Sequence, residues 1–229
     1  MLYFDEYYLA LVLPALILSL IAQVAVKSTF SKFSKTPCSR GLTGADAASE
    51  VLRKNGVNDV RIERVSGRLS DHYDPRKKVL RLSDDVYGSS SVAAVGVAAH
   101  EAGHALQHAR AYAPLMLRGT LVPVANIGSN FGPFLAVAGF VLGFDQLINI
   151  GIILFSVGVL FYLITLPVEF NASHRALQEI DRIGILSRTE LSGAKKVLRA
   201  AAMTYLASAL VAFASLARLI LLSRGRRRR

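Results

Sequence analysis

Cysteine and histidine are scarce in this sequence, and the shortage limits the kinds of site it can build. Cys38 is the only cysteine among 229 residues, so no intrachain disulfide bond can form. A zinc site made of cysteines is excluded as well, and any metal site must use histidine and carboxylate ligands. The chain has five histidines, and three of them lie within nine residues of one another: His100, His104 and His108.

Apolar residues, by contrast, are abundant and gathered in long blocks. They make up 52% of the chain, and the mean hydropathy is +0.40, which is high for a soluble domain. The formal net charge is +11. The basic residues flank the apolar blocks instead of forming a nucleic-acid-binding module, and lipid headgroups and membrane topology explain such flanks. We therefore predict a membrane protein whose partner is the lipid bilayer and which binds no nucleic acid.

Four blocks are long enough to cross a bilayer, which takes about 20 helical residues. The first, 7–26, follows an acidic N-terminus (Asp5, Glu6) that is atypical of a secretory signal peptide, so we interpret it as an uncleaved anchor. Blocks 119–144 and 147–166 are so close together that they should form a helical hairpin. The fourth, 203–222, contains one charge, Arg218, and precedes an arginine-rich end.

The polar segment after the first block predicts a small α+β portion. Thr43 is a suitable N-cap for an amphipathic helix over 43–55, and residues 60–65 alternate between apolar and polar as a short strand does. A turn over 73–78 should lead into a second strand at 79–83, and serines 89–91 can cap a further helix.

That further helix carries the motif H-E-x-x-H, at His100, Glu101 and His104. Positions four apart share one face of a helix, so both imidazoles can bind one ion, and Glu101 can deprotonate a water molecule beside it. The same five-residue pattern arises by chance in helices that bind no metal. The preceding residues are rich in alanine and glycine, which favours a tightly packed helix and hence a metallopeptidase site.

Two histidines do not complete a zinc site, so a third ligand must come from elsewhere in the chain. The third apolar block should return the chain to the side of the motif near Pro167, which brings Glu169 towards His100. A carboxylate at the end of an apolar span is costly unless it is paired or bound to an ion. We predict a Zn²⁺ site formed by His100, His104 and Glu169.

Several neighbours remain alternatives or supporting residues. His108 lies a turn beyond His104, but three collinear histidines cannot converge on one tetrahedral ion without bending the helix, so we expect it at the surface or beside the ligands. His174 could bind the metal or stabilise the oxyanion, and Arg175 could do the latter, although both also suit a solvated helix. Asn171 could orient a ligand.

The combination of A-A-H-E-A-G-H-A-L-Q (98–107) with P-V-E-F-N-A-S (167–173) resembles the bacterial neutral zinc metallopeptidase family of small membrane proteins. The similarity runs nearly end to end and includes the segment 70–75. It implies a membrane-bound zinc endopeptidase with His100, His104 and Glu169 as ligands and Glu101 as base. In the similar membrane gluzincins an aspartate often follows the ligand glutamate by four residues. That position is Ser173 here, so the support it gives a ligand histidine should be weaker or come from elsewhere.

The resemblance also suggests roles for residues ahead of the motif. Asp71, His72 and Asp74 fall in a family-like segment and could contact substrate or support the site, although loop solvation is the role that suits each of them better. In zinc peptidases of this kind an edge strand before the active helix commonly pairs with an extended substrate. By analogy we expect this of residues Val79, Leu80, Arg81 and Leu82, with an ordinary hairpin strand as the alternative.

The sequence thus predicts a mainly α integral membrane protein with about four transmembrane helices and a small α+β zincin-like catalytic portion. We divide it into an anchor (1–27), the zincin-like portion (28–118), a transmembrane hairpin (119–166), a helical segment with the third ligand (167–202), and a last transmembrane helix with a basic tail (203–229). The expected function is hydrolysis of peptide or protein substrates, membrane or misfolded proteins among them. The alternative is a non-catalytic metal-binding membrane scaffold or assembly partner.

Charge distribution suggests an orientation in the bacterial plasma membrane. Basic residues outside the spans are more numerous on the side of the motif, as at Lys27, Lys32 and Lys35, than on the side of the termini. The positive-inside rule therefore favours a cytoplasmic catalytic site. The arginines at 224 and 226–229 argue for the opposite orientation.

Overall fold

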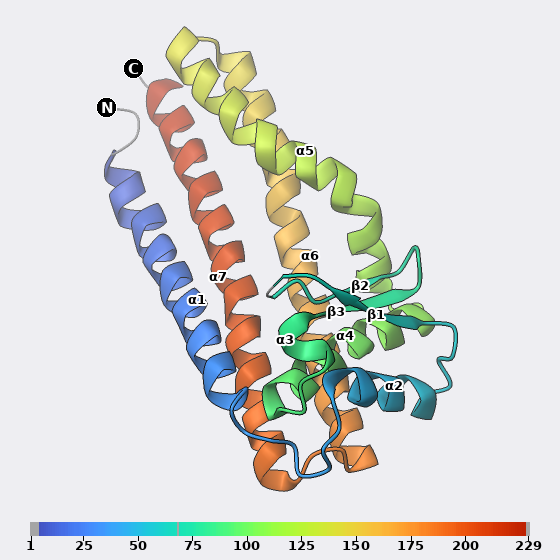
Figure 1. Cartoon of the computed structure of the whole chain (residues 1–229). Coiled ribbons are helices and arrows are strands. Elements are labelled where there is room, and N and C mark those ends of the chain that lie inside the picture. The colour runs from blue at the N-terminus through green and yellow to red at the C-terminus, as the bar shows by residue number, and fades with distance from the viewer. Residues whose placement is uncertain (1–4, 68, 228–229) are drawn as a thin grey trace. The chain divides into compact units, whose positions relative to one another are not determined.

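The structure is a computed structural model that describes residues 5–67 and 69–227. The outermost residues of the predicted anchor and basic tail, 1–4 and 228–229, lie outside this description. The elements follow in the order π-helix Tyr8–Val12, α1 (Leu13–Phe33), α2 (Gly44–Lys54), β1 (Arg61–Val65), β2 (His72–Asp74), β3 (Val79–Ser83), α3 (Asp84–Tyr87), α4 (Val92–Ala109), α5 (Ala113–Leu142), α6 (Asp145–Ile183) and α7 (Arg188–Arg227) (Figure 1).

Among the described residues, four helices are long and apolar enough to cross a membrane, which confirms the predicted fold class. They span Tyr8–Phe33, Ala113–Leu142, Asp145–Ile183 and Arg188–Arg226. Large apolar side chains stay exposed on them, for example Leu20, Phe134 and Val141 at 61–69%. Exposed apolar surface on this scale is expected where hydrocarbon and not water is the solvent.

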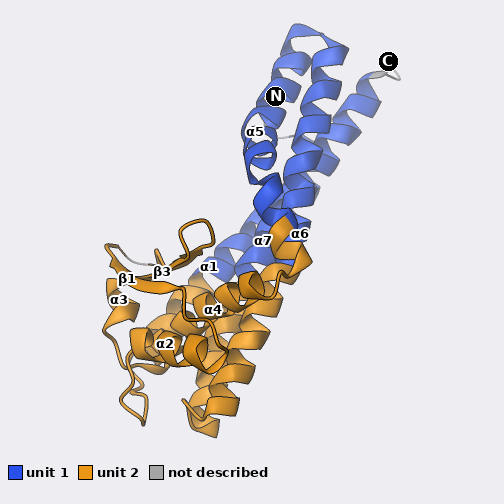
Figure 2. Cartoon of the chain, turned by 90° about the vertical axis from the view of Figure 1, so that its right-hand side faces the viewer, with its two compact units in different colours: residues 1–23, 117–166, 203–229 blue, residues 24–116, 167–202 orange. Residues whose placement is uncertain are grey.

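The chain divides into two compact units, each assembled from distant segments (Figure 2). The first unit contains residues 1–23, 117–166 and 203–229. Within it, Gly128 and Gly132 on α5 face the backbone of α6. A Cβ added at Gly128 would lie 2.2 Å from the carbonyl oxygen of Leu154. This G-x-x-x-G spacing lets the two helices pack at close range, as in other membrane helix pairs.

The second unit contains residues 24–116 and 167–202, with α4 in its core. Helix α2 packs on α4 through Val51 and Leu52, and its N-terminus has a capping box in which Thr43 and Asp46 bond each other's backbone N–H. The predicted helix over 43–55 and the two predicted strands are therefore confirmed, at 44–54, 61–65 and 79–83.

The sheet differs from the prediction in one respect that matters for function. Its strand order is β1-β3-β2, with β1 parallel and β2 antiparallel to β3. Strand β2 lies in the stretch where the sequence predicted a turn. The prediction that Val79, Leu80, Arg81 and Leu82 form an edge strand is wrong, because β1 and β2 pair with β3 on both sides. Val79, Leu80 and Leu82 are fully buried, as expected of a strand in the middle of a sheet, whereas Arg81 between them is partly exposed.

Candidate metal centre

Helix α4 places three motif residues on neighbouring parts of one face. Its N-terminus is capped by the Ser91 hydroxyl, which accepts a hydrogen bond from the backbone N–H of Ala94 at 3.2 Å. His100 lies nine residues after Ser91, and His104 follows it by one helical turn. Glu101 lies beside them with 8% of its surface exposed. The rings of His100 and His104 stand edge to face, with centroids 4.8 Å apart.

The third residue between the histidines, Gly103, allows α6 to approach. A Cβ added at Gly103 would lie 2.6 Å from the carbonyl oxygen of Ala172, which is closer than real Cβ atoms come to backbone. Gly103 and the small Ala172 therefore set the distance between α4 and α6. This close contact brings Glu169, three residues before Ala172, to the histidines.

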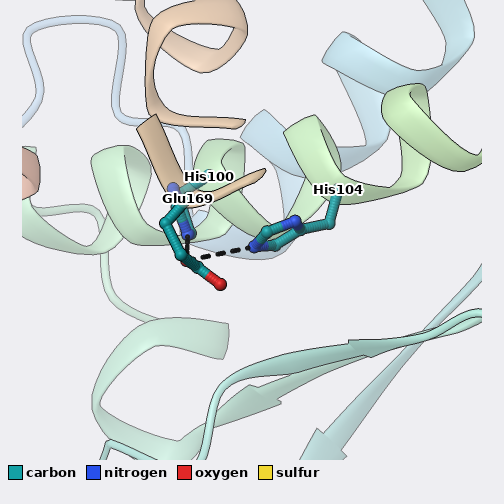
Figure 3. Close-up of side chains that lie close together, drawn as sticks. All are labelled: His100, His104 and Glu169. Atoms are coloured by element: carbon teal, nitrogen blue, oxygen red, sulfur yellow. Dashed lines mark ion pairs between the residues drawn. The ribbon is translucent and has the colours of Figure 1, made fainter. Parts of the chain in front are cut away.

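Glu169 completes a cluster of three ligand atoms (Figure 3). Its Oε2 lies 3.3 Å from His100 Nε2 and 3.5 Å from His104 Nε2, and all three atoms fall within 4.8 Å of one another. Ligands at about 2.0–2.1 Å from one tetrahedral ion are about 3.3–3.4 Å apart. Two imidazole nitrogens and a carboxylate oxygen are ligands that zinc prefers, so these residues fit a zinc ion.

The charges around the cluster favour a cation. Burial alone would lower the pKa of His104, but the carboxylates of Glu169 and Glu101 beside it hold that pKa above its ordinary value. Two imidazoles next to two buried carboxylates thus form an environment that attracts positive charge. A divalent cation bound by these groups would compensate the negative charge of the carboxylates.

Each histidine is held through its other ring nitrogen. The Ser173 hydroxyl lies 3.0 Å from His100 Nδ1, and the Gln107 side-chain oxygen lies 3.0 Å from His104 Nδ1. Gln107 is fully buried, and its amide N–H groups donate to the backbone oxygen of Val168 at 2.8 Å and to Asn171 Oδ1 at 3.0 Å. The Gln107 oxygen can only accept, which places the proton of His104 on Nδ1 and leaves its Nε2 lone pair free for a metal. When the Ser173 hydroxyl accepts from His100 Nδ1, the same holds for His100.

Ser173 occupies the position where similar membrane gluzincins often have an aspartate. The contact expected from an aspartate at this position is made by the Ser173 hydroxyl, which is a neutral group. Gln107 was missed as a supporting residue, although a polar side chain three residues after His104, on the same face of an apolar helix, indicates one. Gly103 was missed too, because the sequence does not show which backbone will lie against it.

The structure separates the three candidate supporting residues on α6. Asn171 takes part in the site, since its side-chain oxygen accepts from Gln107 and, at 2.7 Å, from Arg175 Nε. The Arg175 guanidinium also lies over the Tyr112 ring. His174 is exposed and is not a member of the three-ligand cluster found among the described residues.

Residues of the segment 71–74 have local structural contacts. Asp71 accepts hydrogen bonds from the backbone and hydroxyl of Ser83, and Asp74 accepts from the backbone N–H groups of Arg76 and Lys77 in the following turn. His72 Nδ1 lies 2.8 Å from the backbone oxygen of Ser70. Asp71 and Asp74 therefore stabilise the β2–β3 hairpin.

Fold and site together define a membrane zinc metallopeptidase of the H-E-x-x-H type, and comparison with known proteins agrees. The family model described as "Putative neutral zinc metallopeptidase" matches residues 8–224. The "Putative membrane protease YugP" of Bacillus subtilis (strain 168) is 50% identical over 215 residues, which cover 94% of this chain and 96% of the relative. The chain belongs to this neutral zinc metallopeptidase family. No solved structure matches it significantly.

Proposed function

We propose that the protein is an endopeptidase in which His100, His104 and Glu169 bind Zn²⁺ and Glu101 is the general base. The observation that carries this proposal is the convergence of three ligand atoms from two helices beside a buried glutamate. When bound, Zn²⁺ would polarise the scissile carbonyl and lower the pKa of a water molecule from near 15.7 to roughly 7.

The protein's own residues supply the remaining chemistry. Glu101 accepts a proton from the attacking water and passes it to the leaving amine, which requires a carboxylate within reach of both. Ser173 and Gln107 fix the ring orientation of the ligand histidines before substrate arrives, so little reorganisation is needed during the reaction. Two neutral imidazoles and one carboxylate leave the Zn²⁺ site with a net positive charge.

The substrates we propose are membrane proteins or misfolded segments close to the bilayer, because the same chain carries four candidate spans. An extended substrate needs an exposed strand edge near the site if it is to pair with the sheet. β2 is an edge strand and contacts α4, so it takes the place that the sequence assigned to β3. Basic flanks favour a site on the cytoplasmic side.

Metal analysis tests the ligand set. We expect purified wild type in detergent to hold about one zinc per chain, Glu169→Ala to lose it, and His174→Ala to keep it. His174 is the matched control, since it lies on the same helix outside the cluster. Absence of zinc from the wild type after metal loading at neutral pH would favour the scaffold alternative.

Cleavage of fluorescein-labelled casein tests the mechanism. Glu101→Gln should keep its zinc and lose activity, because the amide cannot accept a proton from water. If the Glu101→Gln protein cleaves casein at the wild-type rate, the role of Glu101 is disproved.

A further inference from the structure

The face of α4 that carries the metal site continues for one more turn. Successive residues of a helix are about 100° apart, so His104 lies about 40° round the axis from His100, His108 about 80° and Glu101 about 100°. His108 therefore lies about 20° round the axis from Glu101, the residue that we propose activates the water, and two turns further along the helix. The small apolar residues Ala98 and Ala102, which pack in the core, lie further round the helix.

The His108 side chain also extends in the right direction. Cα–Cβ bonds of a helix tilt towards its N-terminus, so a side chain covers the turn that precedes its own position. For His108, that turn is the one that carries His104. His108 is partly exposed, so a substrate can reach it.

Tyr73, on the edge strand β2, holds the His108 ring in place. Its hydroxyl lies 2.8 Å from His108 Nδ1, and the two ring centroids are 5.8 Å apart. Burial raises the pKa of Tyr73 to about 12, with Asp59 and Asp74 contributing, so the hydroxyl keeps its proton at neutral pH. If that hydroxyl donates to Nδ1, the neutral imidazole carries its own proton on Nε2.

Peptide hydrolysis needs a donor of this kind. The carbonyl oxygen gains negative charge as water adds, and a preorganised N–H beside it stabilises the transition state. Three polar side chains close to the ligands are already committed: Gln107 and Asn171 to each other, and Ser173 to His100. Arg175 donates through Nε to Asn171.

We propose that His108 Nε2–H donates the hydrogen bond that stabilises the substrate's oxyanion, and that Tyr73 is the positioning residue that fixes the tautomer and orientation of His108. This inference rests on the proposed function and adds to it the missing oxyanion donor. It also assigns a role in catalysis to a strand edge that lies beside substrate.

Four variants and one control test the proposed roles of His108 and Tyr73. His108→Ala removes the ring, and His108→Asn keeps an acceptor near Nδ1 but no donor at the Nε2 position. His108→Gln places an N–H near Nε2. Tyr73→Phe removes only the hydroxyl that holds the ring. Tyr87→Phe is the control, since Tyr87 lies on α3, away from the three-ligand cluster.

Four quantities are measured for each purified protein: bound zinc, kcat and KM on a quenched-fluorescent peptide taken from a bond cleaved in casein, and the inhibition constant of a phosphinic pseudopeptide. Such an inhibitor mimics the tetrahedral anion. His108→Ala and His108→Asn should keep zinc and KM and lose about 10²–10³-fold in kcat. Their inhibition constants should weaken in proportion to kcat/KM. His108→Gln should recover part of the loss, Tyr73→Phe should be intermediate, and Tyr87→Phe should match wild type.

The outcomes distinguish this inference from the function on which it rests. If wild type cleaves casein, Glu101→Gln does not, and His108→Ala keeps its kcat within about twofold, the role of His108 alone is disproved. Loss of zinc in step with activity in the His108 variants would assign the pair a structural role and overturn the inference. A wild type that holds zinc but cleaves nothing would overturn the proposed function, and the oxyanion role with it.

Discussion

Ser173 stabilises His100 with a neutral hydroxyl, at a position where similar membrane gluzincins often have a carboxylate. A carboxylate that accepts from a ligand histidine makes the imidazole more basic and the metal more tightly held. A hydroxyl gives the same orientation with less charge. Because this one side chain sets how His100 is supported, we expect the strength of zinc binding to depend on it.

Substitution of Ser173 should therefore move zinc affinity in both directions. We expect Ser173→Ala to weaken affinity about 10-fold or more, the lower end of the range for such supporting contacts, and Ser173→Asp to bind zinc at least as tightly as wild type. Competition with a chromophoric chelator measures both. Equal affinity in all three proteins would show that the Ser173 contact does not influence the metal.

At the scale of elements, the site depends on how closely α4 and α6 pack. Gly103 faces the backbone of Ala172, which cannot move aside as a flexible side chain could. Any side chain at 103 must push α6 away or leave its own preferred geometry. Because Glu169 lies on that part of α6, a shift of the helix is also a shift of the third ligand.

Gly103→Ala should therefore lose zinc and stability together. We expect a loss of about 1–3 kcal/mol in the free energy of unfolding, the usual cost of overpacking, together with reduced zinc content. Gly88→Ala is the control, because an added Cβ there meets no atom within 4 Å. Thermal unfolding in detergent and metal analysis measure the two effects. A Gly103→Ala protein with normal zinc would show that α4 and α6 tolerate a wider spacing.

In the first of the two compact units, an ion pair connects the residues just before the first candidate span to α7. The Arg218 guanidinium donates to Asp5 Oδ2 at 2.6 and 2.9 Å and lies over the Tyr8 ring. Burial would raise the pKa of Asp5, but the hydrogen bonds from Arg218 and the Tyr8 N–H outweigh it and lower this pKa below its ordinary value. This pairing explains how a charge is accommodated in the last apolar block.

The stability that Asp5 contributes should depend on pH. Because its pKa is lower in the folded protein, the contribution is complete above the ordinary pKa of about 4 and is lost as pH falls through the folded value. We expect Asp5→Asn to cost about 1–3 kcal/mol at pH 7 and progressively less below pH 4. Thermal unfolding at both pH values measures this, with the exposed Glu6→Gln as control. A cost that is the same at pH 7 and below pH 4 would contradict the ion pair.

For the whole molecule, the orientation in the membrane decides which substrates the site can meet. If each candidate helix crosses the bilayer once, residue 77, in the loop between β2 and β3, and residue 146, at the start of α6, lie on opposite sides. Positive flanks predict that the loop is cytoplasmic.

Single-cysteine labelling tests this orientation. In a Cys38→Ala background, which leaves no other thiol, an impermeant maleimide added to intact cells should label Gln146→Cys and not Lys77→Cys. Permeabilisation should expose Lys77→Cys and serves as the control for reactivity. The reverse pattern would place the catalytic site outside and agree with the arginine-rich C-terminus.

Local sequence was enough for features whose cause is local. The capping residue Thr43, the alternation in 61–65 and the length of the apolar blocks fix their elements through nearest neighbours and solvent. His100, Glu101 and His104 share a face because of helical periodicity alone. Strand β3 shows the limit: its strand character could be predicted, but its position between β1 and β2 depends on pairing partners 18 residues away in β1 and 5–9 residues away in β2.

The sequence by itself determined that this is a membrane protein with an H-E-x-x-H helix, since hydropathy and helical spacing are properties of short segments. It also singled out Glu169, through the cost of a carboxylate at the end of an apolar span. Only the tertiary structure decided that Ser173 and Gln107 orient the ligands, that Gly103 sets the helix spacing, and that Tyr73 meets His108. These contacts join residues up to 73 positions apart, and they arise from the packing of whole helices and strands, which no local pattern records.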